Sequence, residues 1–342
     1  GAGASFLQTH CLVGRDDWRC AFLLDRKGQP KRVDGYDELD LSVYADCFVV
    51  AGLALFAVAS GSQESFSFAL ALYNSVKMRI RSGRYNTLPY PLSYGFRAHG
   101  IPMIMTNVAT ELHKASMVFR PDLCGEMLSD VREYTSDILT NFLDHSFTIR
   151  EVISSNRGHL DNLLGQHANP GHTLECMWFL MEASDLLNDA SMAEYSAKIA
   201  LRVLEIGWDY EYGGLLHFCA ASGGSPNELL VEHPHEPTVV NVLAGWGDKL
   251  WWVHSEALYT TLLMYLRTGD PNFLSWHNKV FDYTFSHFSN PNREVREWVQ
   301  ILNRDGSPIN KTVALPVKDP YHIVRNLALI LEVLNAEKEE VL

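Results

Sequence analysis

A turn signal in this sequence is followed directly by residues that could transfer a proton. Asn169-Pro170-Gly171 marks a turn, His172 comes next, and Glu175 lies one helical turn further on. An imidazole at the positive end of a helix is favoured in its neutral form, which can accept a proton near pH 7. The pattern therefore indicates a general base, with the glutamate able to orient it or a substrate. A histidine that only caps the helix is the structural alternative.

A second group combines aromatic rings with a carboxylate. Trp251 and Trp252 precede Glu256 within one expected helix. Flat apolar rings match the C–H face of a sugar, and a carboxylate accepts hydrogen bonds from sugar hydroxyls. This spacing favours a carbohydrate site. Two core tryptophans beside a solvent-facing glutamate would give the same pattern.

A third group lies near the C-terminus. Asp319-Pro320 is a helix-start signal, and it places His322 and Arg325 one turn apart on the same helical face. An arginine in this position could also pair with a surface acid. The group is therefore informative only when it is taken together with the other two.

Metal and nucleotide sites receive little support. The segment 232–236 reads Glu-His-Pro-His-Glu, which has the residue types of metal ligands. Its central proline and its setting in a Gly-, Pro- and Asn-rich stretch argue against a preformed metal site. No glycine-rich phosphate-binding motif is present in the sequence. We therefore expect neither a metal nor a required cofactor.

Composition excludes several classes of partner. The 342 residues carry a net charge of −13, which repels nucleic acid and anionic lipid. The longest apolar run, 47–59, is shorter than the ~18 residues of a membrane span, so we expect one buried helix there. The cysteines match no disulfide framework and indicate a reducing cytosol, hence a cytoplasmic protein. They are Cys11, Cys20, Cys47, Cys124, Cys176 and Cys219.

Helical periodicity dominates the chain, and strand patterns are few. Asp189 or Ser191 opens one helix, and Asp270 before a proline opens another. Short β-hairpins are expected at 18–28 and 298–306, and a further such loop begins at 210–214. The stretch 220–248 is expected to be a long loop. The expected helices cover about 2–11, 42–60, 64–82, 101–117, 122–144, 170–187, 190–207, 249–268, 271–289 and 320–338.

Long helices joined by short links predict antiparallel helical hairpins. The ten expected helices make five hairpins, and stacking them in two concentric rings predicts an all-α fold, an α/α toroid, in a single domain over 1–342. A closed barrel of six hairpins needs one more pair. We therefore expect the first hairpin to be missing before residue 1, which makes the domain N-terminally truncated.

The three groups, in this order, resemble the N-acylglucosamine 2-epimerase family, also known as renin-binding proteins. The family pattern has a Pro-Gly-His-x-x-Glu helix start, a Trp-Trp-x-x-x-Glu-Ala helix and a Pro-Tyr-His-x-x-Arg helix. This chain has them at 170–175, 251–257 and 320–325. Segments 20–30 and 44–48 also resemble the family's first β-hairpin and the helix after it. The resemblance covers nearly the whole chain.

The resemblance implies an (α/α)₆ barrel and a sugar isomerase that interconverts N-acetylglucosamine and N-acetylmannosamine. It assigns proton transfer at C2 of the open-chain sugar to His172 and His322, with Glu256 as an essential polar partner. One base cannot easily serve both faces of a carbon, so two groups with pKa values near the working pH are needed. The side chains expected to bind substrate are Glu175, Trp251, Trp252 and Arg325. The resemblance also implies a possible ATP effector and a possible homodimer.

Two other kinds of function stay open. Helical toroids also carry glycoside hydrolases and lyases, and a hydrolase needs two carboxylates that flank the scissile bond. The matched positions here are mainly histidine, which favours proton transfer at carbon. A catalytically impaired homologue that only binds a sugar is the other alternative.

Overall fold

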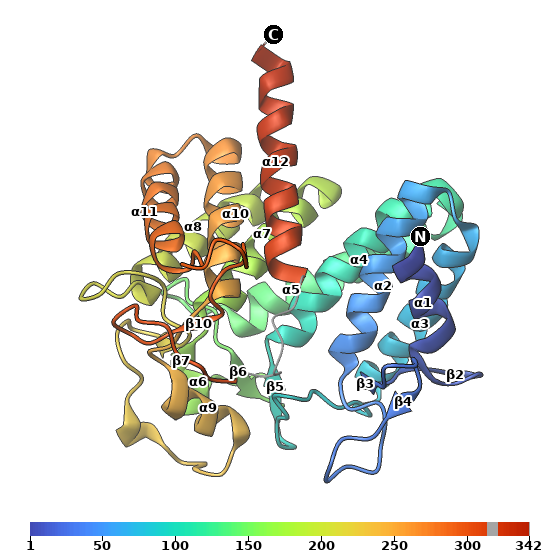
Figure 1. Cartoon of the computed structure of the whole chain (residues 1–342), viewed down its shortest axis with the longest axis horizontal. Coiled ribbons are helices and arrows are strands. Elements are labelled where there is room, and N and C mark those ends of the chain that lie inside the picture. Colours follow the sequence, from blue (N-terminus) through green and yellow to red (C-terminus); the bar gives the residue numbers. More distant parts are fainter. Residues whose placement is uncertain (313–320, 342) are drawn as a thin grey trace. The chain divides into compact units, whose positions relative to one another are not determined.

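The computed structural model describes residues 1–312 and 321–341, with side chains described up to residue 336. It separates into two compact units (Figure 1). Unit 1 comprises Gly1–Pro91 and Ile101–Asp137, and unit 2 comprises Leu92–Gly100 and Ile138–Leu342. The helix-start signal predicted at Asp319-Pro320 lies outside the described residues.

Unit 1 is built from helices and two small antiparallel hairpins. Strand β1 pairs with β2, and β3 pairs with β4 around the predicted turn at 25–28, where the backbone N–H of Gly28 donates to the carbonyl of Asp25. Helices α2 and α3 pack against each other. The elements are α1 (Ala2–His10), β1 (Leu12–Gly14), β2 (Asp17–Cys20), β3 (Leu23–Leu24), β4 (Pro30–Lys31), α2 (Val43–Ser60), α3 (Gln63–Arg81), α4 (Gly100–Phe119), η1 (Pro121–Leu123) and α5 (Cys124–Asp137).

Helix α2 is apolar on every face, and it is longer than the expected run at 47–59. Among the described helices it is the one whose length and composition would allow it to cross a membrane, and half of it is buried inside the structure. It also carries Asp46, which is completely buried and forms an ion pair of 3.0 Å with Arg79 of α3. A buried carboxylate paired with a neighbouring helix is consistent with a core helix of unit 1.

Unit 2 holds the remaining helices, again with two-stranded sheets only among the described residues. Strands far apart in the sequence pair here: β5 with β6, β7 with β8, and β9 with β10. The elements are β5 (Phe96–Ala98), η2 (Ile138–Phe142), β6 (Val152–Ser154), α6 (Leu163–Gln166), β7 (His167–Ala168), α7 (Pro170–Leu187), α8 (Ala190–Gly207), β8 (Cys219–Ala220), η3 (Glu228–Leu230), α9 (Pro237–Gly245), β9 (Lys249–Leu250), α10 (Trp251–Thr268), α11 (Pro271–His287), β10 (Ile301–Leu302) and α12 (Tyr321–Val341).

The helices of unit 2 differ in how much of their circumference is buried. Helices α7 and α10 contact each other and are buried on nearly all sides through their first three turns, whereas α8 and α11 bury one face only. A helix that is apolar on all sides belongs in an interior layer, and an amphipathic helix belongs in an outer layer. The pairs α7–α8 and α10–α11 are therefore hairpins with one inner and one outer helix (Figure 1).

The segment 220–248 is the clearest correction to the sequence interpretation. It was expected to be one long loop, but it contains α9 and a 3₁₀ turn, η3. Val239 and Val242 of α9 are buried in an apolar cluster with Val152, Leu164 and Phe218. The glycines and prolines of this stretch led to the loop prediction. The short helix α9 is stabilised by packing against residues distant in the sequence.

The other predicted elements agree with the structure to within a few residues. Asp189 and Asp270 cap α8 and α11, because their carboxylates accept from the backbone N–H groups of Met192 and Asn272. The hairpin expected at 298–306 is reduced to a bridge across its turn, and strand β10 pairs with β9 instead. The all-α fold class is confirmed, whereas the single-domain assignment stays a prediction.

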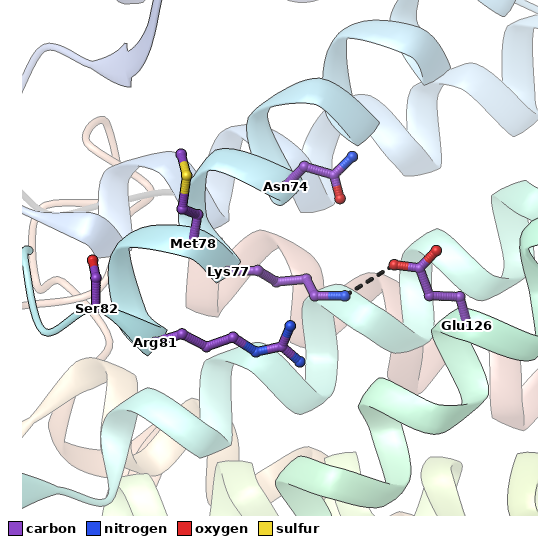
Figure 2. A pocket seen from close by; sticks show the side chains of 6 residues that line it. All are labelled: Asn74, Lys77, Met78, Arg81, Ser82 and Glu126. Atoms are coloured by element: carbon purple, nitrogen blue, oxygen red, sulfur yellow. Dashed lines mark hydrogen bonds and ion pairs between the residues drawn. The ribbon is translucent and has the colours of Figure 1, made fainter.

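A hollow on unit 1 lies between α3 and α5, lined by side chains of both helices (Figure 2). Its central cation, Lys77, is buried and lies 2.5 Å from the Asp130 carboxylate and 3.1 Å from Glu126. Tyr73, also buried, donates its hydroxyl hydrogen to Asp130 at 2.9 Å. Since the ammonium group already has two acidic partners, this cluster stabilises the α3–α5 contact and does not form an anion site.

This cluster generates a test of stability. We expect Asp130→Asn to lower the free energy of unfolding by about 3 kcal/mol, because it leaves the buried Lys77 ammonium without its buried anion. Glu126 is half-exposed, so Glu126→Gln is the matched control and should cost less than about 1 kcal/mol. Urea unfolding followed by circular dichroism measures both values. Equal losses in the two variants would contradict a buried ion pair at this position.

Candidate functional site

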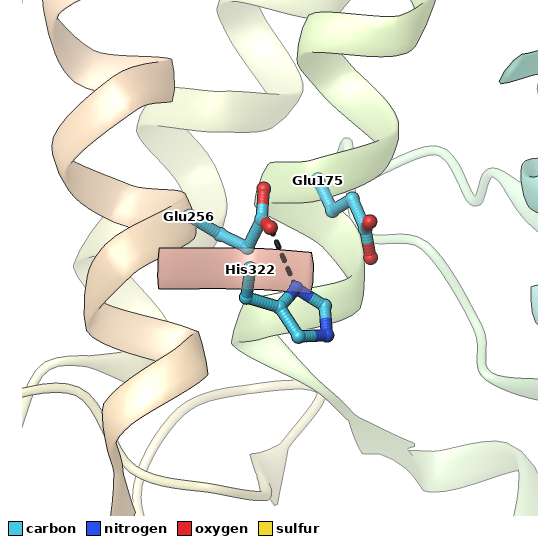
Figure 3. Close-up of side chains that lie close together, drawn as sticks. All are labelled: Glu175, Glu256 and His322. Carbon is cyan, nitrogen blue, oxygen red and sulfur yellow. Dashed lines mark hydrogen bonds and ion pairs between the residues drawn. The ribbon is translucent and has the colours of Figure 1, made fainter. Parts of the chain in front are cut away.

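The three motifs meet within unit 2. The ring centroid of Trp252 lies 5.3 Å from that of His172 and 5.1 Å from that of His322, so one indole contacts both imidazoles. Glu256 is fully buried and accepts a hydrogen bond of 2.7 Å from Nδ1 of His322 (Figure 3). The two histidines, although 150 residues apart in the chain, are thus neighbours of the same aromatic ring.

The Pro-Gly-His motif has a local physical reason. The side chain of Asn169 caps α7 by accepting from the backbone N–H of His172, and Pro170 occupies a first-turn position that needs no N–H. A Cβ atom on Gly171 would lie only 2.4 Å from a ring carbon of Trp252. Glycine is therefore required here so that the indole can lie against the first turn of α7, next to the imidazole.

Glu256 is the centre of a hydrogen-bond network between α7, α10 and α12. One carboxylate oxygen accepts from Nδ1 of His322 and from Nη2 of Arg325 at 2.9 Å, and the other accepts from the indole N–H of Trp178 at 2.9 Å. Burial alone would raise the pKa of Glu256, but Arg325 and His322 outweigh it and hold the pKa at about 2. The carboxylate is therefore ionised and holds the His322 imidazole in one orientation.

Glu175 pairs with the same guanidinium group, and its carboxylate lies near Glu256 and His322 (Figure 3). Its carboxylate accepts from Nη2 of Arg325 at 2.9 Å, so a single nitrogen bridges Glu175 and Glu256. Burial, together with the neighbouring Glu256 charge, raises the pKa of Glu175 above its usual value. Two close carboxylates with their pKa values moved apart divide the roles: one stays anionic, and the other is the more easily protonated.

The same three side chains, Glu175, Glu256 and His322, have ligand atoms within 4.8 Å of one another, which is close enough to surround a metal ion. In the described parts of the chain no other such group of His, Cys, Asp or Glu occurs. The guanidinium of Arg325 already provides the positive charge between the two carboxylates. A divalent cation would have to displace it, so the donor set fits an internal ion-pair network better than a metal site.

The second imidazole has a carboxylate partner that the sequence interpretation missed. Nδ1 of His172 lies 3.0 Å from Oε2 of Glu151, which precedes β6 and is buried. Burial alone would lower the pKa of His172, but the Glu151 anion outweighs it and raises the pKa above the ordinary value. The expectation of a neutral imidazole was therefore wrong: the Glu151 anion outweighs the preference of the helix end. No local motif marks Glu151, because its importance comes only from the tertiary contact between its side chain and His172 of α7.

Two further predictions concern Glu175 and the tryptophan pair. Glu175 was expected to orient the histidine or a substrate, but its carboxylate pairs with Arg325, and Glu151 orients His172 instead. Trp252, rather than Trp251, contacts the imidazoles, and Trp251 is only 4% exposed, which leaves its ring little surface for a sugar.

The segment 232–236 is not a free connection. Glu232 accepts a hydrogen bond from the side chain of Asn162, and Glu236 accepts from the backbone N–H of Ser93. The ring of His233 packs edge-on against Phe96. These contacts tie the segment to unit 2 and give its acidic residues structural partners.

The Glu151–His172 pair can be tested directly. We expect Glu151→Gln to lower the pKa of His172 from above about 6.5 to below it, because the amide removes the anion while the burial remains. A ¹⁵N NMR titration of the imidazole nitrogens measures this pKa. Glu236→Gln, in a second buried glutamate of unit 2, serves as the control and should leave the titration of His172 where it was. An unchanged pKa in the Glu151 variant would contradict the assignment of this partner.

Comparison with known proteins places this geometry in a family. The sequence profile of N-acylglucosamine 2-epimerase (GlcNAc 2-epimerase) matches residues 7–326. An N-acylglucosamine 2-epimerase of Bos taurus is 30% identical over 341 residues, which cover 98% of this chain and 74% of that protein.

Solved structures share the fold. The cellobiose 2-epimerase of Bacillus thermoamylovorans superposes with a TM-score of 0.74 at 18% identity, covering 96% of this chain and 79% of that one. A D-mannose isomerase superposes with a TM-score of 0.72 at 16% identity, covering 97% and 79%. Cellobiose 2-epimerases are (α/α)₆ barrels, so the comparison confirms the predicted fold class. The family profile, matched over nearly the whole sequence, shows that this chain belongs to the N-acylglucosamine 2-epimerase family of carbohydrate isomerases.

Proposed function

We propose that this protein interconverts N-acetylglucosamine and N-acetylmannosamine by proton transfer at C2, with His172 and His322 as the two acid–base groups. One observation carries the proposal. Each imidazole is held through Nδ1 by its own buried carboxylate, and both rings contact the same indole, Trp252. Family membership supports a sugar epimerase, and the Bos taurus relative supports the N-acetylated substrate.

The Nδ1 contacts define which nitrogen can exchange a proton with the sugar. When Nδ1–H donates to Glu151 or Glu256, the neutral ring carries its lone pair on Nε2. Nε2 of one histidine removes the proton from C2 of the open-chain aldose, and the electron pair moves into an enediolate. Nε2–H of the other histidine then returns a proton to the opposite face of C2. No net proton is consumed, and the two histidines exchange roles in the reverse direction.

The surroundings suit this chemistry. The indole of Trp252, a neighbour of both imidazoles, can contact the apolar face of a sugar. Arg325 lies beside His322 and Glu256, and its positive charge supports the developing charge on the enediolate oxygen. The two carboxylates next to it share one guanidinium nitrogen, which is an arrangement unlike a hydrolase pair that flanks a scissile bond. Epimerisation is therefore favoured over glycoside hydrolysis.

Deuterium exchange provides the first test. After incubation with N-acetylmannosamine in deuterated water, we expect deuterium at C2 of both epimers, detected by NMR. His172→Asn and His322→Asn should each slow interconversion by about 10²–10⁴-fold, because each removes the group that serves one face. Either variant can still wash deuterium into the epimer served by the remaining histidine.

A matched control uses an exposed histidine. His235→Asn, in the segment 232–236, should leave the exchange rate unchanged. Undiminished interconversion in both the His172 and His322 variants would place the chemistry elsewhere. A wild-type protein that cleaves oligosaccharides without exchange at C2 would support the hydrolase alternative, and a protein that binds the sugar without either reaction would be an impaired homologue.

Metal dependence can be tested separately. Dialysis against EDTA should leave the epimerisation rate within about twofold of the untreated protein, because Arg325 already pairs with both Glu175 and Glu256. The rate is measured before and after adding back Mg²⁺, Mn²⁺ or Zn²⁺. Loss of activity that any of these ions restores would show that a cation replaces the guanidinium in the working enzyme.

A further inference from the structure

A third histidine lies behind the carboxylate that orients His172. His99 follows β5 and is completely buried. Its position is fixed by the β5–β6 pairing, because its backbone N–H donates to the carbonyl of Glu151 at 2.9 Å. The same ladder therefore places the side chains of both residues next to each other in the interior of unit 2.

The Glu151 carboxylate lies between two imidazoles. Oε2 contacts Nδ1 of His172 at 3.0 Å, and Oε1 lies 3.5 Å from Nδ1 of His99. Within the described residues, neither Oε1 nor the ring nitrogens of His99 make a closer hydrogen bond. A buried polar side chain without another partner is uncommon, so each group is the available partner of the other.

We propose that His99 is a positioning residue for the epimerisation: it holds the second oxygen of Glu151 and so fixes the carboxylate that orients His172. This inference rests on the proposed function. It adds a three-membered His–Glu–His unit behind one of the two proton-transfer groups. His322 is held differently, since its carboxylate partner, Glu256, is supported by Arg325 and Trp178.

The charges around His172 determine the sign of the effect. The acidic groups that face it are Glu151, Glu175 of α7 and Glu256 of α10, and all three favour its cation. The imidazoles of His167 and His217 face it from two other segments, and both have pKa values lowered by burial. His217 is held neutral, with a pKa of about 3.

Removing the ring of His99 takes away a donor, or a positive charge when that ring is protonated, from the far side of Glu151. Glu151 stays ionised, because His172 holds its pKa well below the usual range even against burial. The carboxylate then attracts the His172 proton more strongly. Loss of the donor and loss of the positive charge both favour the His172 cation, so the pKa of His172 should rise further.

The test compares a leucine and an asparagine at this position. His99→Leu keeps the volume and removes the donor, whereas His99→Asn keeps an N–H donor near the place of Nδ1. We expect the pKa of His172 in a ¹⁵N NMR titration to rise by about 0.5–1 pH unit in His99→Leu and to stay near the wild-type value in His99→Asn. His277→Leu, in a partly buried histidine of α11 that contacts Thr261, controls for general destabilisation.

Isotope exchange distinguishes a positioning role from a purely structural one, because a structural defect would slow exchange in both epimers equally. In His99→Leu, exchange of the C2 proton should slow about tenfold in the epimer served by His172, and should stay near the wild-type rate in the epimer served by His322. The His172→Asn variant identifies which epimer is which. Equal slowing of both exchanges, or a His172 titration unchanged in His99→Leu, would overturn the proposal.

The two arms separate this inference from the proposed function. The NMR titration needs no turnover, so an inactive wild-type protein would overturn the epimerase assignment without affecting the measured link between His99 and His172. Conversely, an active protein whose His99→Leu variant behaves like wild type in both measurements would leave the epimerase assignment intact and remove His99 from it.

Discussion

The burial of three carboxylates in unit 2 is the constraint on which the site depends. Glu151, Glu175 and Glu256 are each less than a tenth exposed, and a buried carboxylate costs several kcal/mol unless a cation or donor compensates it. The compensating groups are the imidazoles of His172 and His322 and the guanidinium of Arg325. The contacts that make these acids tolerable in the interior are the same contacts that orient the proton-transfer groups.

The two imidazoles are supported independently. His172 is attached to the β5–β6 pair through Glu151, and His322 is attached to α10 through Glu256. Separate carboxylates allow the two proton affinities to be adjusted separately, which a reaction that uses both rings alternately as acid and base requires. Trp252 connects the two supported imidazoles, since its indole lies against both rings and against the backbone of Gly171.

Much of the helical frame of the site could be predicted from the sequence. The periodicity of α7 and α10, the proline and glycine before His172, and the Trp-Trp-x-x-x-Glu spacing each have a local cause, so they can be recognised in a single segment. Helix α9 could not be recognised in this way. Its buried valines gain their stability from packing against residues about 80 positions earlier in the chain, and the stretch that precedes it is dominated by turn-forming residues.

The sequence by itself determined the all-α fold class, most helix boundaries and three of the groups that meet at the site, because capping, periodicity and motif spacing act over one or two helical turns. Only the tertiary structure decided which carboxylate serves which histidine. Glu151 and His99 flank short strands with no distinctive local pattern. Antiparallel pairing of these distant strands brings the two residues together, and Glu151 in turn contacts His172. The pKa of His172 is likewise a tertiary property: its own helix end disfavours the cation, and a buried anion from another segment reverses that preference.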